Sequence, residues 1–392
     1  MDNEYIFPFS LMVYDKYHTM YMIHATYKSI IFRVSFTLAH ITRKEISNKM
    51  NLQNTKTLRK QVAPFEKTTT MKSIWQITNT IVPFITLWYL AYICLSVSYW
   101  LALVPIVLAA GFLVRVFIIF HDCTHHSFFK SRRVNRIVGT AMGVLTLFPF
   151  DQWGHEHSIH HATSGNLDKR GTGDIWTLTV DEYLAAPLRL RLTYRFYRNP
   201  LVMFGLGPIY VFLLKNRFNR KGARRKERLN TYLTNVLFVA LIGILCWTVG
   251  WQSVILVQGS IFLLSGSLGI WLFYVQHTFE DSYFEENSEW EYVKAAVEGS
   301  SFYKLPKFIQ FLTGNIGYHH VHHLSPRVPN YKLEEAHNNT TPLQSVPTIT
   351  LATSLKSLRF RLWDEKTKNF VSFKDVKALA KKRVSVQIKP EL

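Results

Sequence analysis

Cysteine and acidic side chains are scarce in this chain. Its 392 residues include three cysteines, Cys94, Cys123 and Cys246, and no CxxC pair, so neither a disulfide framework nor an iron–sulfur site is indicated. Only 26 acidic residues accompany 46 lysines and arginines, for a formal net charge of +20. This imbalance favours an anionic partner. A phospholipid surface or an acidic protein fits better than nucleic acid, because no nucleic-acid-binding motif is present.

Several signatures of redox enzymes and hydrolases are also missing. The sequence contains no HExxH pattern of zinc hydrolases, no HPGG haem motif and no flavin fingerprint. Any electrons used in a reaction are therefore expected to come from another protein. The chain opens with Met-Asp-Asn-Glu, which is not a basic signal-peptide start, so no cleavable signal is expected.

Long apolar runs are the first feature that is abundant. Hydrophobic residues make up 48% of the chain and aromatic residues 15%. Four runs, at about 74–95, 101–120, 231–249 and 252–276, are each about 20 residues long, enough to cross a bilayer as a helix. Uncharged turns join them in pairs. We therefore expect an all-α polytopic membrane protein with two transmembrane helical hairpins and a helical cap.

Basic residues flank these hairpins and predict their orientation. Four cations precede the first hairpin and four follow it, and the stretch 215–228 before the second hairpin holds eight. The positive-inside rule then places these flanks, the cap and both termini in the cytoplasm. Two shorter apolar segments, 134–150 and 201–214, are interpreted as interfacial or re-entrant, so four core spans are expected, with six as the alternative.

Histidine is concentrated in three short clusters. These are HDCTHH (121–126), HEHSIHH (155–161) and HHVHH (319–323), and each lies just after or near an apolar run. Within each cluster, histidines three or four residues apart share one helix face. So many imidazoles on shared faces indicate a metal centre.

The number of histidines favours two metal ions rather than one. Neutral imidazole suits iron, zinc and copper, and eight to ten histidines exceed the ligands that one ion can use. Asp122 and Glu156 are candidate partners that would orient the ligands. A histidine-rich metal transporter or receptor is the alternative of another class, although transporters place such residues inside the membrane rather than at its edge.

The three boxes resemble those of the membrane fatty acid desaturase family. HDCTH (121–125), HSIHH (157–161) and HHVHH (319–323) match in order and spacing, as do the hairpins, over about residues 55–340. In detail the chain resembles Bacillus-type bacterial acyl-lipid desaturases of the Delta-5 type. LRKQVAPFEK (58–67), WGHEHSIHHATSGNLDKRGTGD (153–174) and GYHHVHHLSPRVPNY (317–331) carry this closer likeness.

The resemblance implies a di-iron enzyme that uses O2 and two external electrons to introduce a double bond into saturated acyl chains of membrane phospholipids. Ferredoxin or flavodoxin would be the donor. A lipid or alkane hydroxylase of the same superfamily is the alternative activity. The family's ligand pattern falls on nine residues: His121, His125, His157, His160, His161, His277, His319, His322 and His323. His277 lies outside the clusters, at the end of the last span.

Other residues receive weaker assignments. His126, His155 and His320 are candidate additional ligands that lie off the ligand faces. Four residues are expected either to line the acyl route or to support the metal ligands: Trp153, Asp168, Asp174 and Trp176. The surplus of aromatic residues is expected to line an apolar channel.

The organisation that follows from these features has three parts. Residues 1–49 form an N-terminal extension of unknown role. Residues 50–340 form the desaturase domain in the cell membrane. Residues 341–392 form a basic cytoplasmic C-terminal region.

Overall fold

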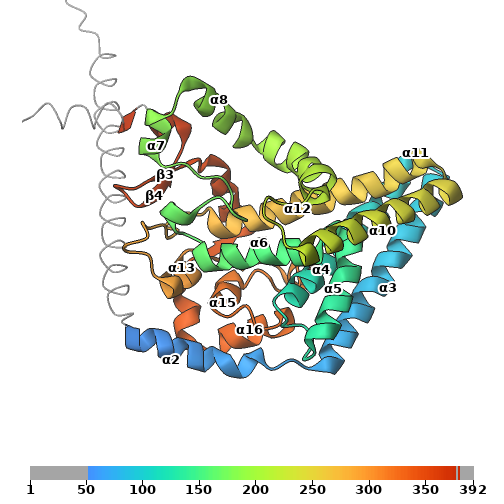
Figure 1. Cartoon of the computed structure of the whole chain (residues 1–392), viewed down its shortest axis with the longest axis horizontal. Coiled ribbons are helices and arrows are strands. Elements are labelled where there is room, and N and C mark those ends of the chain that lie inside the picture. The colour runs from blue at the N-terminus through green and yellow to red at the C-terminus, as the bar shows by residue number, and fades with distance from the viewer. Residues whose placement is uncertain (1–51, 377, 380–392) are drawn as a thin grey trace, which may run out of the picture. The chain divides into compact units, whose positions relative to one another are not determined.

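The computed structural model describes residues 52–376, 378 and 379 (Figure 1). Helix α2 (Leu52–Val62) crosses the boundary between an N-terminal unit, residues 1–57, and the main unit, residues 58–392. The main unit is described below. The expected N-terminal extension, residues 1–49, lies outside the described residues, as does most of the basic tail after 376.

Two long helical hairpins form the membrane part. Helices α3 (Thr70–Leu95) and α4 (Tyr99–Thr124) are joined by a short turn at Ser96–Ser98. Helix α10 (Arg225–Val249) turns at Gly250 into a continuous helical segment, Trp251–His277, made of α11 (Trp251–Val254), the π-helical η6 (Ile255–Gly259) and α12 (Ser260–His277). Each segment has 25 to 27 residues, about 39 Å of helix at 1.5 Å per residue, which exceeds the ~30 Å of bilayer hydrocarbon.

These four segments confirm the expected fold class. They are the only helices in the described part of the chain that are long and apolar enough to cross a membrane. The six-span alternative is therefore not supported there. The two shorter segments instead form α5 (Arg132–Thr146) and a chain of short turns, η3 (Val202–Leu206), α9 (Gly207–Ile209) and η4 (Tyr210–Leu214), of which η3 and η4 are π-helical.

Helix α4 is the centre of the packing, and α3, α5 and α12 contact it. Small residues such as Ala102, Ala109 and Ala110 let its neighbours approach closely. The outward faces of α3 and α10 carry exposed large apolar side chains, among them Trp75, Val236 and Trp247, as expected for a lipid-facing surface.

The remaining elements form the cap. Between the hairpins lie η2 (Leu167–Lys169), α6 (Phe150–Thr163), α7 (Val180–Ala185), α8 (Leu188–Tyr197) and η5 (Lys215–Arg217). After α12 come α13 (Tyr292–Glu298), α14 (Lys307–Leu312), α15 (His319–Leu324) and α16 (Asn330–Asn338). The short helical turns are η1 (Ala63–Glu66), η7 (Thr341–Ser345), α17 (Leu351–Ser354) and η8 (Leu355–Arg359).

Two small sheets complete the cap. Strands β1 (Phe302–Lys304) and β2 (Thr348–Thr350) pair in parallel, and β3 (Leu362–Asp364) and β4 (Asn369–Val371) pair antiparallel. The segment after residue 340 packs closely on the rest: Trp363 is 1% exposed, and the Tyr274 hydroxyl of α12 donates to the Ser357 carbonyl at 2.7 Å. Strands of three residues leave little sequence pattern, so neither pair was predictable from the sequence.

Candidate metal centre and acyl cavity

Four helices bring the predicted histidines together. The last turn of α4 carries His121, and His125 is its C-cap residue. Helix α6 presents one face with three histidines, α15 repeats the same i, i+3, i+4 spacing, and His277 is the last residue of α12. Eight of the nine side chains are buried, and His125 is partly exposed.

The nine histidines separate into two groups. The first group contains His121, His125, His157, His161 and His322. The second group contains His160, His277, His319 and His323. In each group the candidate ligand atoms lie within 4.8 Å of one another.

The distances between ring nitrogens fit a shared metal ion. In the first group, Nε2 of His161 lies 3.1 Å from Nε2 of His157 and 2.9 Å from Nε2 of His322. In the second group, Nε2 of His277 lies 2.9 Å from Nε2 of His319 and 3.2 Å from Nε2 of His160. Two nitrogens bound about 2.1 Å from one ion, at an angle of about 90–110°, would be about 3.0–3.4 Å apart.

The electrostatics of the groups also suit a cation. Burial, reinforced by neighbouring imidazoles, holds the pKa of His157, His161 and His322 well below the ordinary 6.5, so these rings are neutral near pH 7. Neutral imidazole is the form that binds metals. Several buried nitrogens in the two groups have no hydrogen-bond partner: His125 Nε2, His161 Nδ1, His319 Nδ1 and His322 Nδ1.

Carboxylates and a carbonyl hold three of the rings from behind. Nδ1 of His121 lies 3.2 Å from Oδ1 of Asp122, and Nδ1 of His160 lies 2.5 Å from Oδ1 of Asp174. Nδ1 of His277 faces the Gly299 carbonyl at 3.2 Å. Such partners fix the ring orientation and leave Nε2 free for a metal. Each group therefore contains one histidine that is paired with an aspartate.

Asp174 is one of the four residues expected to line the acyl route or support the ligands, and the local backbone explains its position beside His160. It follows Gly173, whose φ of +77° is left-handed, and a Cβ there would lie 3.0 Å from Cβ of His160. Glycine thus lets this loop reach α6. Asp168 instead accepts from the Asn287 backbone N–H at 2.8 Å, and the Trp176 ring contacts Tyr194 and Tyr197.

Four residues suggested by the sequence lie elsewhere. The Glu156 carboxylate pairs with Lys215 at 3.2 Å. His126, His155 and His320 belong to neither group. His126 follows the C-cap of α4 with a φ of 56°, and His320 points its Nε2 at Nδ1 of His337, 3.0 Å away.

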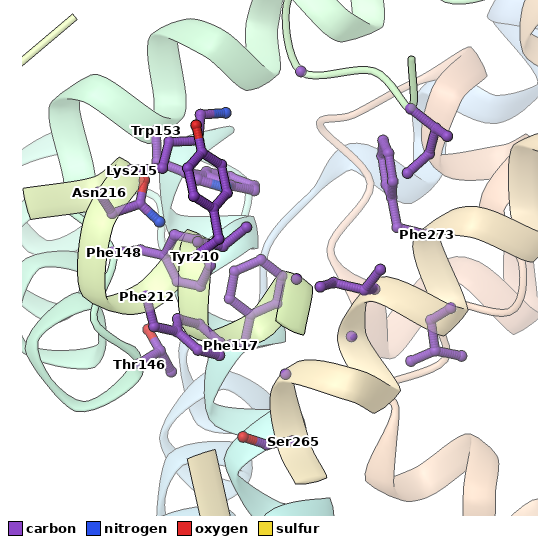
Figure 2. Close-up of a pocket in the computed structure, with 18 of the residues that line it drawn as sticks. Phe117, Thr146, Phe148, Trp153, Tyr210, Phe212, Lys215, Asn216, Ser265 and Phe273 are labelled. Carbon is purple, nitrogen blue, oxygen red and sulfur yellow. The ribbon is translucent and has the colours of Figure 1, made fainter. Parts of the chain in front are cut away.

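A mostly apolar cavity of about 630 Å³ reaches the two groups. His121, His157 and His319 line it, together with α4, α12 and the turns from η3 to η5. Figure 2 shows Phe117, Phe148 and Phe212 on one side and Phe273 on the other. Trp153 stacks on His157 with ring centroids 4.3 Å apart. The volume falls in the usual range for small-molecule sites.

One end of the cavity, the polar end, carries the cation Lys215. In Figure 2, Lys215, Asn216 and Trp153 lie toward one end and Ser265 toward the other. Sequence reasoning expected aromatic residues along an acyl route, but it assigned no lining residue in the η3–η5 turns or along α12. Those residues are far from the histidine boxes in sequence.

Comparison with known proteins agrees with this arrangement. A family model for fatty acid desaturases matches residues 98–347. The chain is 68% identical to a fatty acid desaturase of Bacillus subtilis (strain 168) over 322 residues, which cover 82% of this chain and 92% of that protein.

Two more distant relatives come from Synechocystis. An sn-1 oleoyl-lipid 12-desaturase is 26% identical over 64% of this chain and 69% of its own length. An sn-1 acyl-lipid omega-3 desaturase (ferredoxin) is 28% identical over 58% and 64%. With its four candidate spans and paired histidine groups, the chain belongs to the fatty acid desaturase family and is a membrane oxidoreductase.

Proposed function

We propose that this protein is an O2-dependent acyl-lipid desaturase whose nine clustered histidines hold two iron ions. The first group would supply His121, His125, His157, His161 and His322, and the second His160, His277, His319 and His323. The observation that carries the proposal is the contact between both groups and a single apolar cavity. Bound there, the irons would supply O2 activation.

The overall reaction must balance electrons and protons. Two adjacent methylenes lose two hydrogen atoms, and two electrons and two protons come from outside. Together they reduce O2 to two water molecules, and a C=C bond forms. The side chains of this protein hold the reacting methylenes beside His121, His157 and His319, the ligands that line the cavity. The apolar wall excludes bulk water from the reacting carbons.

An acyl chain attached to a phospholipid fits the polar end of the cavity. Lys215 lines this end, and its side chain is 44% exposed. Its ammonium, which also pairs with Glu156, would bind a phosphate, and Tyr210 and Asn216 add polar groups nearby. Two relatives act on acyl lipids by name. We propose membrane phospholipid chains as substrates and, from the Bacillus-type boxes, Delta-5 as the double-bond position.

A small acidic protein such as ferredoxin or flavodoxin is the proposed electron donor. The name of one relative includes ferredoxin. The stretch from Lys215 to Arg228 has eight cations and one acid, and it runs from η5, beside the cavity, into the first turn of α10. Charge complementarity of this kind speeds association. By the positive-inside rule we place this stretch, the histidine groups and both termini in the cytoplasm of a cell whose plasma membrane holds the hairpins.

Expression in a bacterial host without desaturases tests this function. We expect mass spectrometry of the host lipids to show new chains lighter by two hydrogens when the wild-type protein is made, and none with His160→Ala. A gain of oxygen instead would support the hydroxylase alternative. New unsaturation in both strains, or in neither, would overturn the proposal. Derivatisation of the double bond gives its position.

A further inference from the structure

A buried hydrogen-bond network supports His121 through Asp122. Oδ2 of Asp122 accepts from the backbone N–H of Asn330 at 2.7 Å and from its side-chain Nδ2 at 2.8 Å. Oδ1 of the same carboxylate faces His121 Nδ1. Asp122 and Asn330 are each 1% exposed. The carboxylate therefore has two donors behind it and one imidazole in front.

Asn330 is fixed in turn by other segments. Its Oδ1 accepts from Nε2 of Gln76 in α3 at 2.8 Å, and its carbonyl accepts from Nδ2 of Asn315 at 3.2 Å. Gln76 is 3% exposed. Asn330 is also the first residue of α16, so its N–H has no partner within the helix. One asparagine thus connects α3, α4 and α16 to a predicted ligand.

The hydrogen bonds of this network determine how Asp122 and the His121 ring are oriented. A buried carboxylate is costly unless it is fully hydrogen-bonded, and the Asn330 donors meet that need. Held this way, Asp122 accepts the Nδ1 proton of His121, which selects the tautomer whose Nε2 is free for a metal. Two neighbours set the amide orientation of Asn330: the Asp122 carboxylate can only accept, so Nδ2 faces it, and Oδ1 then accepts from Gln76 Nε2.

We propose that Asn330, oriented by Gln76, is a positioning residue for the first histidine group. It keeps Asp122 in the conformation that presents Nε2 of His121 to the metal. The inference rests on the proposed function, since it assumes that the first group binds iron. It gives a role to the PNY end of the segment GYHHVHHLSPRVPNY (317–331), whose histidines are the predicted ligands.

The asymmetry between the groups makes the proposal testable. The second group depends on Asp174, which Asn330 does not contact, so a change at Asn330 should weaken one metal site and not the other. Asn330→Asp is nearly isosteric and replaces the Nδ2 donor with an oxygen facing Asp122. Loss of such a partner typically lowers metal affinity by about 10- to 100-fold.

Metal content is the appropriate measurement. Detergent-purified protein is loaded with Fe²⁺ without O2 and dialysed against a weak chelator, and the iron per chain is then determined. We expect two irons in the wild type and in the exposed control Asn338→Asp. We expect about one iron per chain in Asn330→Asp, because the metal affinity of the first group should fall by about 10- to 100-fold.

A second variant covers the case in which Asn330→Asp does not fold. Gln76→Glu faces Asn330 Oδ1 with an acceptor, which favours the flipped amide and turns its oxygen toward Asp122. We expect the same loss of one iron. If either folded variant keeps both irons with wild-type release, or loses both in parallel, the inference is wrong. A wild type that binds no iron would instead refute the proposed function.

Discussion

Gly269 of α12 offers a direct test of the acyl cavity. It lies eight residues before His277, about 12 Å along the helix at 1.5 Å per residue. It lines the cavity, and a Cβ placed on it would meet no atom within 4 Å. A leucine there can therefore extend into the cavity without moving the backbone. It would occupy space that the acyl chain needs.

The size of the effect follows from the methylenes displaced. A leucine side chain excludes roughly three methylenes, each worth about 0.8 kcal/mol of burial, or about 2.4 kcal/mol in total. Since 1.4 kcal/mol is tenfold, long chains should lose roughly 50-fold in kcat/KM, whereas chains too short to reach Gly269 should be unaffected.

The assay compares product lipids from cells fed saturated chains of different length. Gly243→Leu is the matched control, because Gly243 in α10 also has open space around it but does not line the cavity. We expect Gly269→Leu to shift products toward shorter chains and Gly243→Leu to match the wild type. An unchanged chain-length distribution in Gly269→Leu would refute acyl binding along α12.

Three further predictions follow from the site. Gly173→Ala places a Cβ against His160 and Glu156 in a left-handed backbone. The free energy of unfolding should therefore fall by about 1–2 kcal/mol or more, which lowers the melting temperature, and the second group should lose metal. Gly171→Ala, at φ +109° with no neighbour within 4 Å, should keep its metal, and equal metal loss in both would contradict the steric argument. Burial lowers the pKa of His157, His161, His319 and His322 below 6.5, so as pH falls the unfolded chain binds protons at a higher pH than the folded chain does. The metal-free protein should then lose stability as pH falls below about 6.5, by roughly 1.4 kcal/mol per unit for each histidine, and a flat melting temperature from pH 7 to 5 would contradict this. Turnover with reduced ferredoxin should slow as salt rises, and salt-independent turnover would refute docking on the basic stretch 215–228.

The features that can be predicted from the sequence are those that leave a local pattern of apolar or histidine residues. The four spans follow from long, predominantly apolar runs, and the structure confirms them as candidate spans. The grouping of the histidines follows from helical spacing, because residues three and four apart share a face. Their closeness in space follows from topology, since two hairpins with uncharged outer turns bring the span ends to one side. Their role as iron ligands stays a prediction.

The parts that escaped prediction depend on contacts distant in sequence. Asp174 reaches His160 only because Gly173 adopts a left-handed φ. Asn330 donates to Asp122 although the two residues are 208 positions apart in the sequence, and Gln76 reaches Asn330 from another helix, α3. The cavity wall combines α4 and α12 with π-helical turns that no periodicity announces. Spacing within one helix contains no information about such partners.

The iron content of the purified wild-type protein tests the central claim most directly. The full chain is purified without chelators, and its metals are identified and counted by elemental mass spectrometry. Two histidine groups with separate ligand sets predict two irons per chain, falling to about one in His277→Ala, which removes a ligand from the second group alone. A wild type with one iron or none, or with zinc in place of iron, would contradict the account.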